Sequence, residues 1–350
     1  NKLATCIPDV SAPYFDHAKL CLNLRGLVVD FLIEYGIFLA KAITVVIAIV
    51  LVIAAAGGAA VKSKGQHKRE MKVEKVNDRL TEFKETLEHA VLNKDSIKQL
   101  KKDVAAQEKA DKKKAKASAK TGATLKVKPR VYVLDFKGDI KASAVEAFRD
   151  AVTSVLQVVN ADKDEVVVRL ESPGGMVHSY GLASAQLDRL KTAGVRLTVC
   201  VDRVAASGGY MMACVADKIV ASPFAIMGSI GVVAQLPNFN KLLKKNDIDY
   251  EILTAGEYKR TLTMFGENTD EGREKFKADL EDTHQLFKAY VSERRPSVDI
   301  ESVANGDIWF GTKALEVALV DGLQTSDEYI VDACQNADVF SIEFKDKKSL

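Results

Sequence analysis

From Pro129 onward, short apolar runs alternate with stretches of helical pattern, and this alternation limits the possible folds more than any other feature of the chain. Strand–helix–strand units of this kind build a mostly parallel sheet that is covered on both faces. We therefore expect one α/β domain over residues 129–350, which is long enough to bury a single large core. The predicted strands are Val131–Phe136, Val166–Leu170, Leu197–Val201, Lys218–Ala221 and Tyr250–Leu253. The predicted helices are Ala142–Val159, Val177–Thr192, Ser207–Val215, Asn238–Lys245, Asp270–Arg294 and Thr312–Leu319.

An uncharged run, AITVVIAIVLVIAAAGGAA, occupies residues 42–60. At about 1.5 Å per residue, a helix of this length crosses a hydrocarbon core of roughly 30 Å. The alternatives are a cleavable signal and a buried core helix, but the run is long for a signal and a basic segment follows it directly. We predict one N-terminal transmembrane helix within residues 29–61, with a lipid bilayer as its partner. Residues 1–28 are treated as an N-terminal extension, and one interpretation is that Val28 or Val29 marks a start codon other than Met.

Residues 62–128 are highly charged, and apolar residues recur at spacings of three and four from Val73 to Val91. This period predicts a helix with a narrow apolar stripe. Few opposite charges lie four residues apart, so local ion pairs support the helix only weakly. We predict a charged helical stalk that passes after Leu100 into a linker rich in Lys and Ala. Its simplest role is that of a solvated spacer, and contact with anionic lipid head groups is the alternative.

The net charge of the chain is close to zero, because 50 Lys and Arg residues face 48 Asp and Glu residues. A chain without a strong positive field is not expected to bind nucleic acid. The five cysteines are an odd number, and none belongs to a CxxC pair. We therefore expect no disulfide framework and no metal site, and no motif indicates a cofactor.

Turns rich in glycine and small residues follow two of the predicted strands, at Glu171–Met176 and Ala205–Tyr210. In a parallel sheet, turns at the carboxyl ends of the strands line one crevice, so we expect these two turns to lie close together. Ser207, in the second turn, precedes a predicted helix and so lies beside unpaired backbone N–H groups. Its hydroxyl is either a simple helix cap or a nucleophile.

The backbone N–H groups of Gly174, Gly175 and Gly208 are the candidate donors of an oxyanion hole. A serine nucleophile also needs a base. His178 follows the first turn directly, and Lys259 is the other candidate, because a desolvated lysine can act in its neutral form. His284 is expected to be a surface or packing residue of the long helix. No pattern separates Lys259 from its neighbour Arg260, so the residues alone leave the base open.

Four stretches of the predicted α/β domain, taken in order, resemble the SppA (signal peptide peptidase A) family of membrane-associated serine peptidases. They read ESPGGMVHSYGLA, DRVAASGGYMMACVADKIVASP, MGSIGVVAQ, and TAGEYKRTLTMFGENT followed by EGREKF. The similarity extends from about Val29 to the C-terminus. Four motifs in order are far more specific than any one of them.

This resemblance implies a ClpP/crotonase-like fold and a Ser–Lys catalytic dyad. On this sequence, Ser207 corresponds to the family's nucleophile, Lys259 to its general base, and Pro173–Gly175 to the turn that lines its oxyanion hole. Longer members of the family carry two copies of the fold, whereas this chain has one, so a ring-like homo-oligomer is expected. The segment Gly228–Ala234 is expected to pair with an extended substrate as an added strand.

Together these features predict a membrane-anchored serine endopeptidase that acts through an acyl-enzyme on peptides or unfolded segments near the bilayer. One alternative keeps the peptidase and takes His178 as the base. The other is a non-catalytic, membrane-tethered scaffold that only binds peptides, because fold alone does not give function. The expected location is the bacterial inner membrane, with a single pass. The basic residues at 62–69 favour a cytoplasmic domain, whereas the family resemblance favours the periplasmic side, so the sidedness is left open.

Overall fold

The computed structural model describes residues 36–50, 69–99, 102, 106, 109 and 128–346. The chain divides into two compact units, of which the first ends at Lys68 and the second begins at Arg69. In the first unit, residues 36–50 are helical. Within the described ranges, no helix is both long enough and apolar enough to span a membrane. The predicted extension, the remainder of the predicted anchor and residues 110–127 of the predicted Lys/Ala-rich linker lie outside the described residues.

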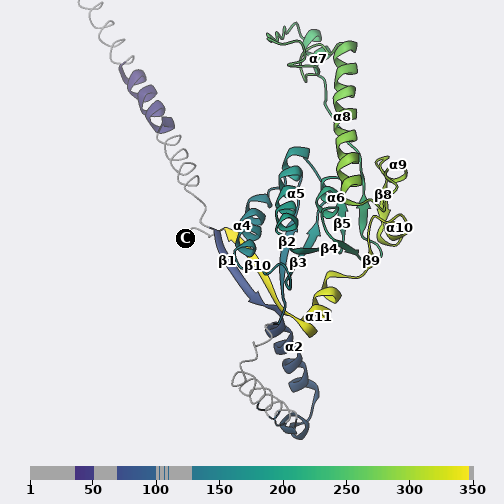
Figure 1. Cartoon of the computed structure of the whole chain (residues 1–350). Helices are drawn as coiled ribbons and strands as arrows, with labels where there is room; N and C mark the ends of the chain where they lie inside the picture. Colours follow the sequence, from purple (N-terminus) through teal and green to yellow (C-terminus); the bar gives the residue numbers. More distant parts are fainter. Residues whose placement is uncertain are drawn as a thin grey trace, which may run out of the picture. The chain divides into compact units, whose positions relative to one another are not determined.

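The second unit contains a seven-stranded sheet with the order β1–β10–β2–β3–β4–β6–β9 (Figure 1). All neighbouring pairs are parallel except β1 and β10, so the expected mostly parallel sheet is confirmed. A smaller sheet has the order β5–β7–β8. The strands of the large sheet are β1 (Arg69–Lys75), β2 (Arg130–Lys137), β3 (Glu165–Glu171), β4 (Arg196–Val201), β6 (Lys218–Ala221), β9 (Gly322–Leu323) and β10 (Asp338–Asp346). Those of the small sheet are β5 (Val204–Ala206), β7 (Ile226–Gly228) and β8 (Ile308–Phe310).

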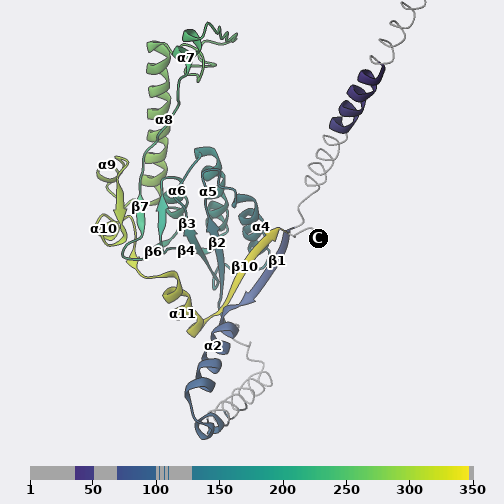
Figure 2. The ribbon, with the colours of Figure 1, turned by 180° about the vertical axis from the view of Figure 1, so that it is seen from behind.

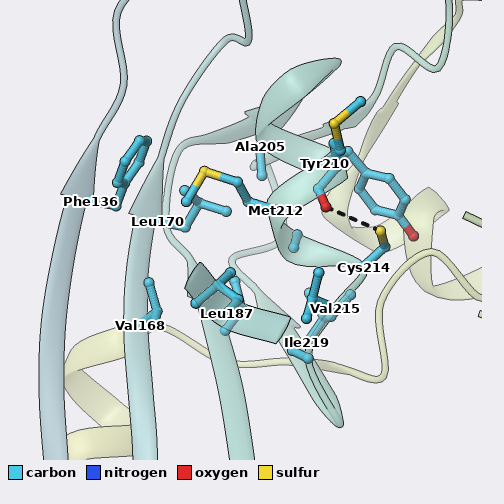
Figure 3. Close-up of a cluster of buried hydrophobic side chains, with 14 of the residues drawn as sticks. Phe136, Val168, Leu170, Leu187, Ala205, Tyr210, Met212, Cys214, Val215 and Ile219 are labelled. Carbon is cyan, nitrogen blue, oxygen red and sulfur yellow. Dashed lines mark hydrogen bonds between the residues drawn. The ribbon is translucent and has the colours of Figure 1, made fainter. Parts of the chain in front are cut away.

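Helices cover both faces of the large sheet. The first face packs against α4, α5 and α6, and the second packs against α2 and α11. Figure 3 shows part of the first core, where Leu187 of α5 and Met212 of α6 lie beside Val168 and Leu170 of β3. Full burial of one such side chain contributes about 1.5–3 kcal/mol to the free energy of unfolding. The helices are α2 (Val76–Val91), α4 (Val145–Leu156), α5 (Val177–Thr192), α6 (Gly208–Ala213), α7 (Asn240–Lys245), α8 (Asp270–Arg294), α9 (Ile300–Val303), α10 (Gly311–Glu316) and α11 (Ser326–Asn336).

The predicted strand at Tyr250–Leu253 is wrong, because these residues form an irregular, exposed segment. The Tyr250 ring packs against the Phe265 ring, with 5.7 Å between the centroids. The Ile252 side chain lies against Gly266. Local aromatic and aliphatic contacts therefore replace the sheet partner that the apolar run was expected to find.

The helical period that begins at Val73 is also wrong at its start, because Val73 lies in β1. This strand pairs antiparallel with β10 and places Val73 opposite Ile342. An ion pair joins Lys75 at the end of β1 to Asp338 at the start of β10, with 3.0 Å between nitrogen and oxygen. The predicted helix is confirmed in α2 and at residues 94–99. The first residue of α2, Val76, is buried against the second face of the sheet. The part of the predicted stalk from Arg69 to Val91 thus belongs to the same compact unit as the large sheet.

Residues 239–269, which we call the arm, project from this unit. The arm contains α7 and lies at the N-terminal end of α8, away from both sheets (Figures 1 and 2). Thr269 caps α8, because its side-chain oxygen accepts a hydrogen bond of 3.0 Å from the Gly272 N–H. The 25-residue helix α8 therefore begins at the arm, and its C-terminal half forms part of the wall of a cavity described below.

Candidate active site

Ser207 lies at a tight turn between β5 and α6. Its backbone has φ 51° and ψ −120°, a conformation that side-chain-bearing residues rarely adopt and that costs about 1–3 kcal/mol. The Ser207 N–H donates to the Gly228 carbonyl at 2.8 Å, and its carbonyl accepts from the Met211 N–H at 3.0 Å. The side chain forms no cap hydrogen bond with α6. The interpretation of Ser207 as a simple helix cap is therefore wrong, and Ser207 lines a cavity instead.

The two glycine-rich turns meet in space, as the sequence predicts. The Ala206 N–H donates to the Ser172 carbonyl at 3.0 Å, and a β-bridge joins Ser172 to Ala205. Gly174 has φ 88°, and a Cβ at this position would lie 2.7 Å from both Ser207 Cβ and the Gly208 nitrogen. Only a glycine at position 174 allows the first turn to approach the second this closely.

Two of the three predicted oxyanion donors have free N–H groups. Within the described part of the chain, the N–H groups of Gly175 and Gly208 form no hydrogen bond, and both residues line the cavity beside Ser207. The Gly174 N–H, in contrast, donates to the Ser172 hydroxyl at 3.1 Å. Gly174 therefore contributes close approach of the backbone, while Gly175 and Gly208 offer donors to an anion in the cavity.

The cavity has a volume of roughly 990 Å³ and lies between α5, α6, α8 and the segment that follows β7. Its wall is mostly apolar, which suits extended peptides with apolar side chains. Tyr290 also lines it, and burial raises the pKa of its hydroxyl to about 12, so this group stays protonated at neutral pH. The apolar lining residues are Ile140, Val177, Met211, Val232, Val233, Leu286 and Phe287.

The two histidines of the predicted domain lie in different surroundings. His178 is exposed and does not line the cavity. His284 lies in the cavity wall, where its Nε2 is 3.3 Å from the Ile230 carbonyl oxygen. The place of His284 could have been predicted from the sequence, because it lies one turn before Phe287 on the helix face that packs toward the core.

Lys259 does not lie in this cavity. It belongs to the arm, where the neighbouring Tyr258 ring packs 5.5 Å from Lys275 Nζ. Lys275 precedes His284 of the cavity wall by nine positions, which is about 13 Å along α8. No lysine or arginine of the described residues lines the cavity. A single chain therefore brings Ser207, Gly174, Gly175 and Gly208 together and leaves Lys259 outside.

The close contact at Gly174 makes a testable prediction. We expect Gly174→Ala to lower the free energy of unfolding by about 1–3 kcal/mol, because the new Cβ meets backbone atoms at an unfavourable φ. Denaturant melts of both proteins in the same detergent measure the difference. The matched control is Gly181→Ala in α5, where an added Cβ meets no atom within 4 Å. Equal stability of Gly174→Ala and wild type would show that the two turns are not in contact.

Two family models match the chain in succession. The model described as Peptidase family S49 N-terminal matches residues 30–187, and the model described as Peptidase family S49 matches residues 189–340. A curated protein of Haemophilus influenzae named "Probable protease SohB" is 46% identical over an alignment of 337 residues, which covers 92% of this chain and 91% of that protein. The protein of the same name from Buchnera aphidicola subsp. Acyrthosiphon pisum is 56% identical over 223 residues, which are 64% of this chain and 66% of that protein.

Among solved structures, a mutant of the 1510-N membrane-bound stomatin-specific protease in complex with a substrate peptide is 14% identical to this chain. The superposition has a TM-score of 0.38 and covers 61% of this chain and 92% of that chain.

Proposed function

The chain belongs to peptidase family S49, as do its SohB relatives, and from this premise we propose that it is a serine endopeptidase of peptides and unfolded segments. The observation that carries the proposal is that Ser207, whose side chain caps no helix, lines a cavity together with Gly175 and Gly208, whose backbone N–H groups are free in the described part of the chain. The full-length protein in detergent is expected to hydrolyse unfolded casein without added cofactor. An active preparation whose activity does not depend on Ser207 would contradict the proposal.

The proposed mechanism begins with attack of Ser207 Oγ on the scissile carbonyl carbon. The serine proton passes to a general base, and the carbonyl oxygen becomes an oxyanion held by the N–H groups of Gly175 and Gly208. The intermediate collapses, the base returns its proton to the leaving amine, and an acyl-enzyme remains. Water then attacks the ester by the same steps and frees Ser207.

For the general base we propose Lys259 of a second copy of the chain. The arm that carries Lys259 exposes apolar side chains to solvent, among them Leu253, which is 94% exposed, and the half-exposed Tyr250 and Phe265. Exposed apolar patches of this kind mark association surfaces. A contact between the arm of one copy and the cavity of the next would be head-to-tail, and such contacts form a ring when the rotation from copy to copy closes. The homo-oligomer would then supply the base that the single chain lacks, in a pocket dry enough to keep the amine neutral.

Substrate binding is proposed to use the segment after β7. Residues 231–235 follow β7 without regular secondary structure, and three of them line the cavity. In the described part of the chain, the backbone N–H and carbonyl groups of residues 231–235 form no hydrogen bond. An extended peptide can therefore pair with this segment as an added strand, while its side chains enter the apolar cavity.

Membrane attachment is proposed from the uncharged run at residues 42–60. We expect the full-length protein to remain with bacterial inner membranes after an alkaline wash, and a chain that begins at Lys62 to remain in the supernatant. Release of the full-length protein by the same wash would contradict a single-pass anchor. Protease accessibility in spheroplasts would then give the side on which the catalytic unit lies.

One observation favours a second candidate, a membrane-tethered scaffold that binds peptides without cleaving them. The cavity of the single chain has no lysine, arginine or carboxylate among its described lining residues, and His284 is its only imidazole. A scaffold would bind casein peptides equally well with serine or alanine at position 207 and would release no fragments. The two candidates therefore differ in product formation and not in binding.

A further inference from the structure

Two buried hydroxyl groups lie behind the glycine-rich turns. Ser172 directly follows β3, and Tyr180 lies in the first turn of α5. Both residues are 0% exposed, so neither hydroxyl can touch a substrate in the cavity. A buried hydroxyl without a hydrogen-bond partner costs about 1–3 kcal/mol, so the partners of these two groups are informative.

The two hydroxyls form an ordered chain of hydrogen bonds. The Tyr180 hydroxyl donates to the Asp139 carbonyl at 2.8 Å, and it lies 2.5 Å from Ser172 Oγ. Because a phenol has a single proton, Ser172 must be the donor to Tyr180. Ser172 Oγ in turn accepts the Gly174 N–H at 3.1 Å. Burial raises the pKa of Tyr180, which keeps its hydroxyl protonated and able to donate.

Tyr180 also touches the second turn directly. A Cβ at Gly208 would lie 2.4 Å from Cγ of the Tyr180 ring. A Cβ at Gly138 would lie 2.3 Å from the Tyr180 hydroxyl oxygen, so the segment after β2 also packs against this side chain. One side chain therefore contacts Gly208 through its ring and holds Gly174 through Ser172.

We propose that Tyr180 is a positioning residue, which sets the spacing between the Gly174–Gly175 turn and the Gly208 N–H. This inference rests on the proposed peptidase function and adds a residue that acts on the oxyanion donors from behind. Oxyanion stabilisation depends on donors about 2.7–3.1 Å from the place where the charge develops. If the Gly174–Gly175 turn loses its hydrogen bonds to Ser172 and Tyr180, these donors are misplaced relative to the oxyanion. This weakens binding of the transition state more than binding of the substrate.

The test is Tyr180→Phe, which keeps the ring against Gly208 and removes only the hydroxyl. We expect kcat for a casein-derived peptide to fall by roughly 10- to 100-fold, with KM within about twofold of wild type. The matched control is Tyr210→Phe, because Tyr210 is also 0% exposed and its hydroxyl donates to a carbonyl, that of Leu319, at 2.9 Å. This control is expected to lower the melting temperature similarly and to leave kcat near the wild-type value.

Ser172→Ala provides a second measurement, since it breaks the same hydrogen-bond chain at its middle. The double variant with Tyr180→Phe is expected to lose no more activity than the more impaired single variant, because both changes break the same chain of hydrogen bonds.

Equal losses of kcat in Tyr180→Phe and Tyr210→Phe would overturn the inference, as would a higher KM with unchanged kcat. If the wild type shows no Ser207-dependent hydrolysis, the proposed function fails, and this inference fails with it. If the wild type is active and Tyr180→Phe equals it, only this inference fails.

Discussion

Ser207→Ala is expected to lower kcat for casein hydrolysis by about 10⁵- to 10⁶-fold, because loss of a serine nucleophile removes the entire covalent route. The residual rate would come from the oxyanion donors and from substrate binding alone. The variant should bind peptide as tightly as wild type, since the alanine leaves the cavity wall unchanged. Release of casein fragments over hours, measured by mass spectrometry with the protein in detergent, covers the required range of rates.

The matched control for this variant is Ser222→Ala. The Ser222 hydroxyl donates to the Asp202 carbonyl at 2.6 Å, and Ser222 does not line the cavity. Its removal is expected to leave kcat near the wild-type value and to change stability by about 1 kcal/mol. If Ser207→Ala and wild type release fragments at the same rate, the peptidase proposal is wrong. If neither releases fragments and both bind peptide, the scaffold is the better account.

The alternation of apolar runs predicted the large sheet because each of its central strands is flanked by helices that are close in sequence. Each of the strands β2, β3 and β4 belongs to one strand–helix unit, and the local apolar pattern predicts its bounds. β1 could not be predicted in this way, because its partner β10 begins 263 residues after the end of β1. In β1, Met71 and Val73 alternate with charged residues, but Val73 also fits the helical period that continues to Val91. Pairing with β10 makes the segment a strand.

The residues of the candidate site that lie in a single glycine-rich turn could be predicted from the sequence. Ser207 and Gly174 each lie in a small-residue turn after a strand, and parallel strands bring such turns to one edge. Tyr180 was not predictable, because a tyrosine on the inner face of a helix resembles any core residue. Its role depends on simultaneous contacts with Ser172 and Gly208, which lie 8 residues before it and 28 residues after it.

Lys259→Ala is expected to be nearly as inactive as Ser207→Ala, because a nucleophile and its base act as a unit. The matched control is Arg260→Ala, which changes an adjacent positive charge in the same exposed segment of the arm. This control should retain activity, since a guanidinium stays protonated and cannot accept the serine proton. A Lys259→Ala protein with wild-type kcat would remove the lysine from the mechanism.

A mixture of two inactive variants distinguishes a base from the same chain from a base of a second copy. If Lys259 of one copy acts on Ser207 of the next, co-assembly of Ser207→Ala and Lys259→Ala chains creates sites with both wild-type residues. Random assembly at equal amounts gives such a pairing at about one site in four, so about a quarter of the wild-type rate is expected to return. If the arm instead moves within one chain to reach its own cavity, every site keeps one defect and the mixture stays inactive. The structure favours the first outcome. Lys275, which lies beside Tyr258 of the arm, is about 13 Å along α8 from the cavity wall. Closing this gap within one chain would require α8 to bend or the arm to detach from it.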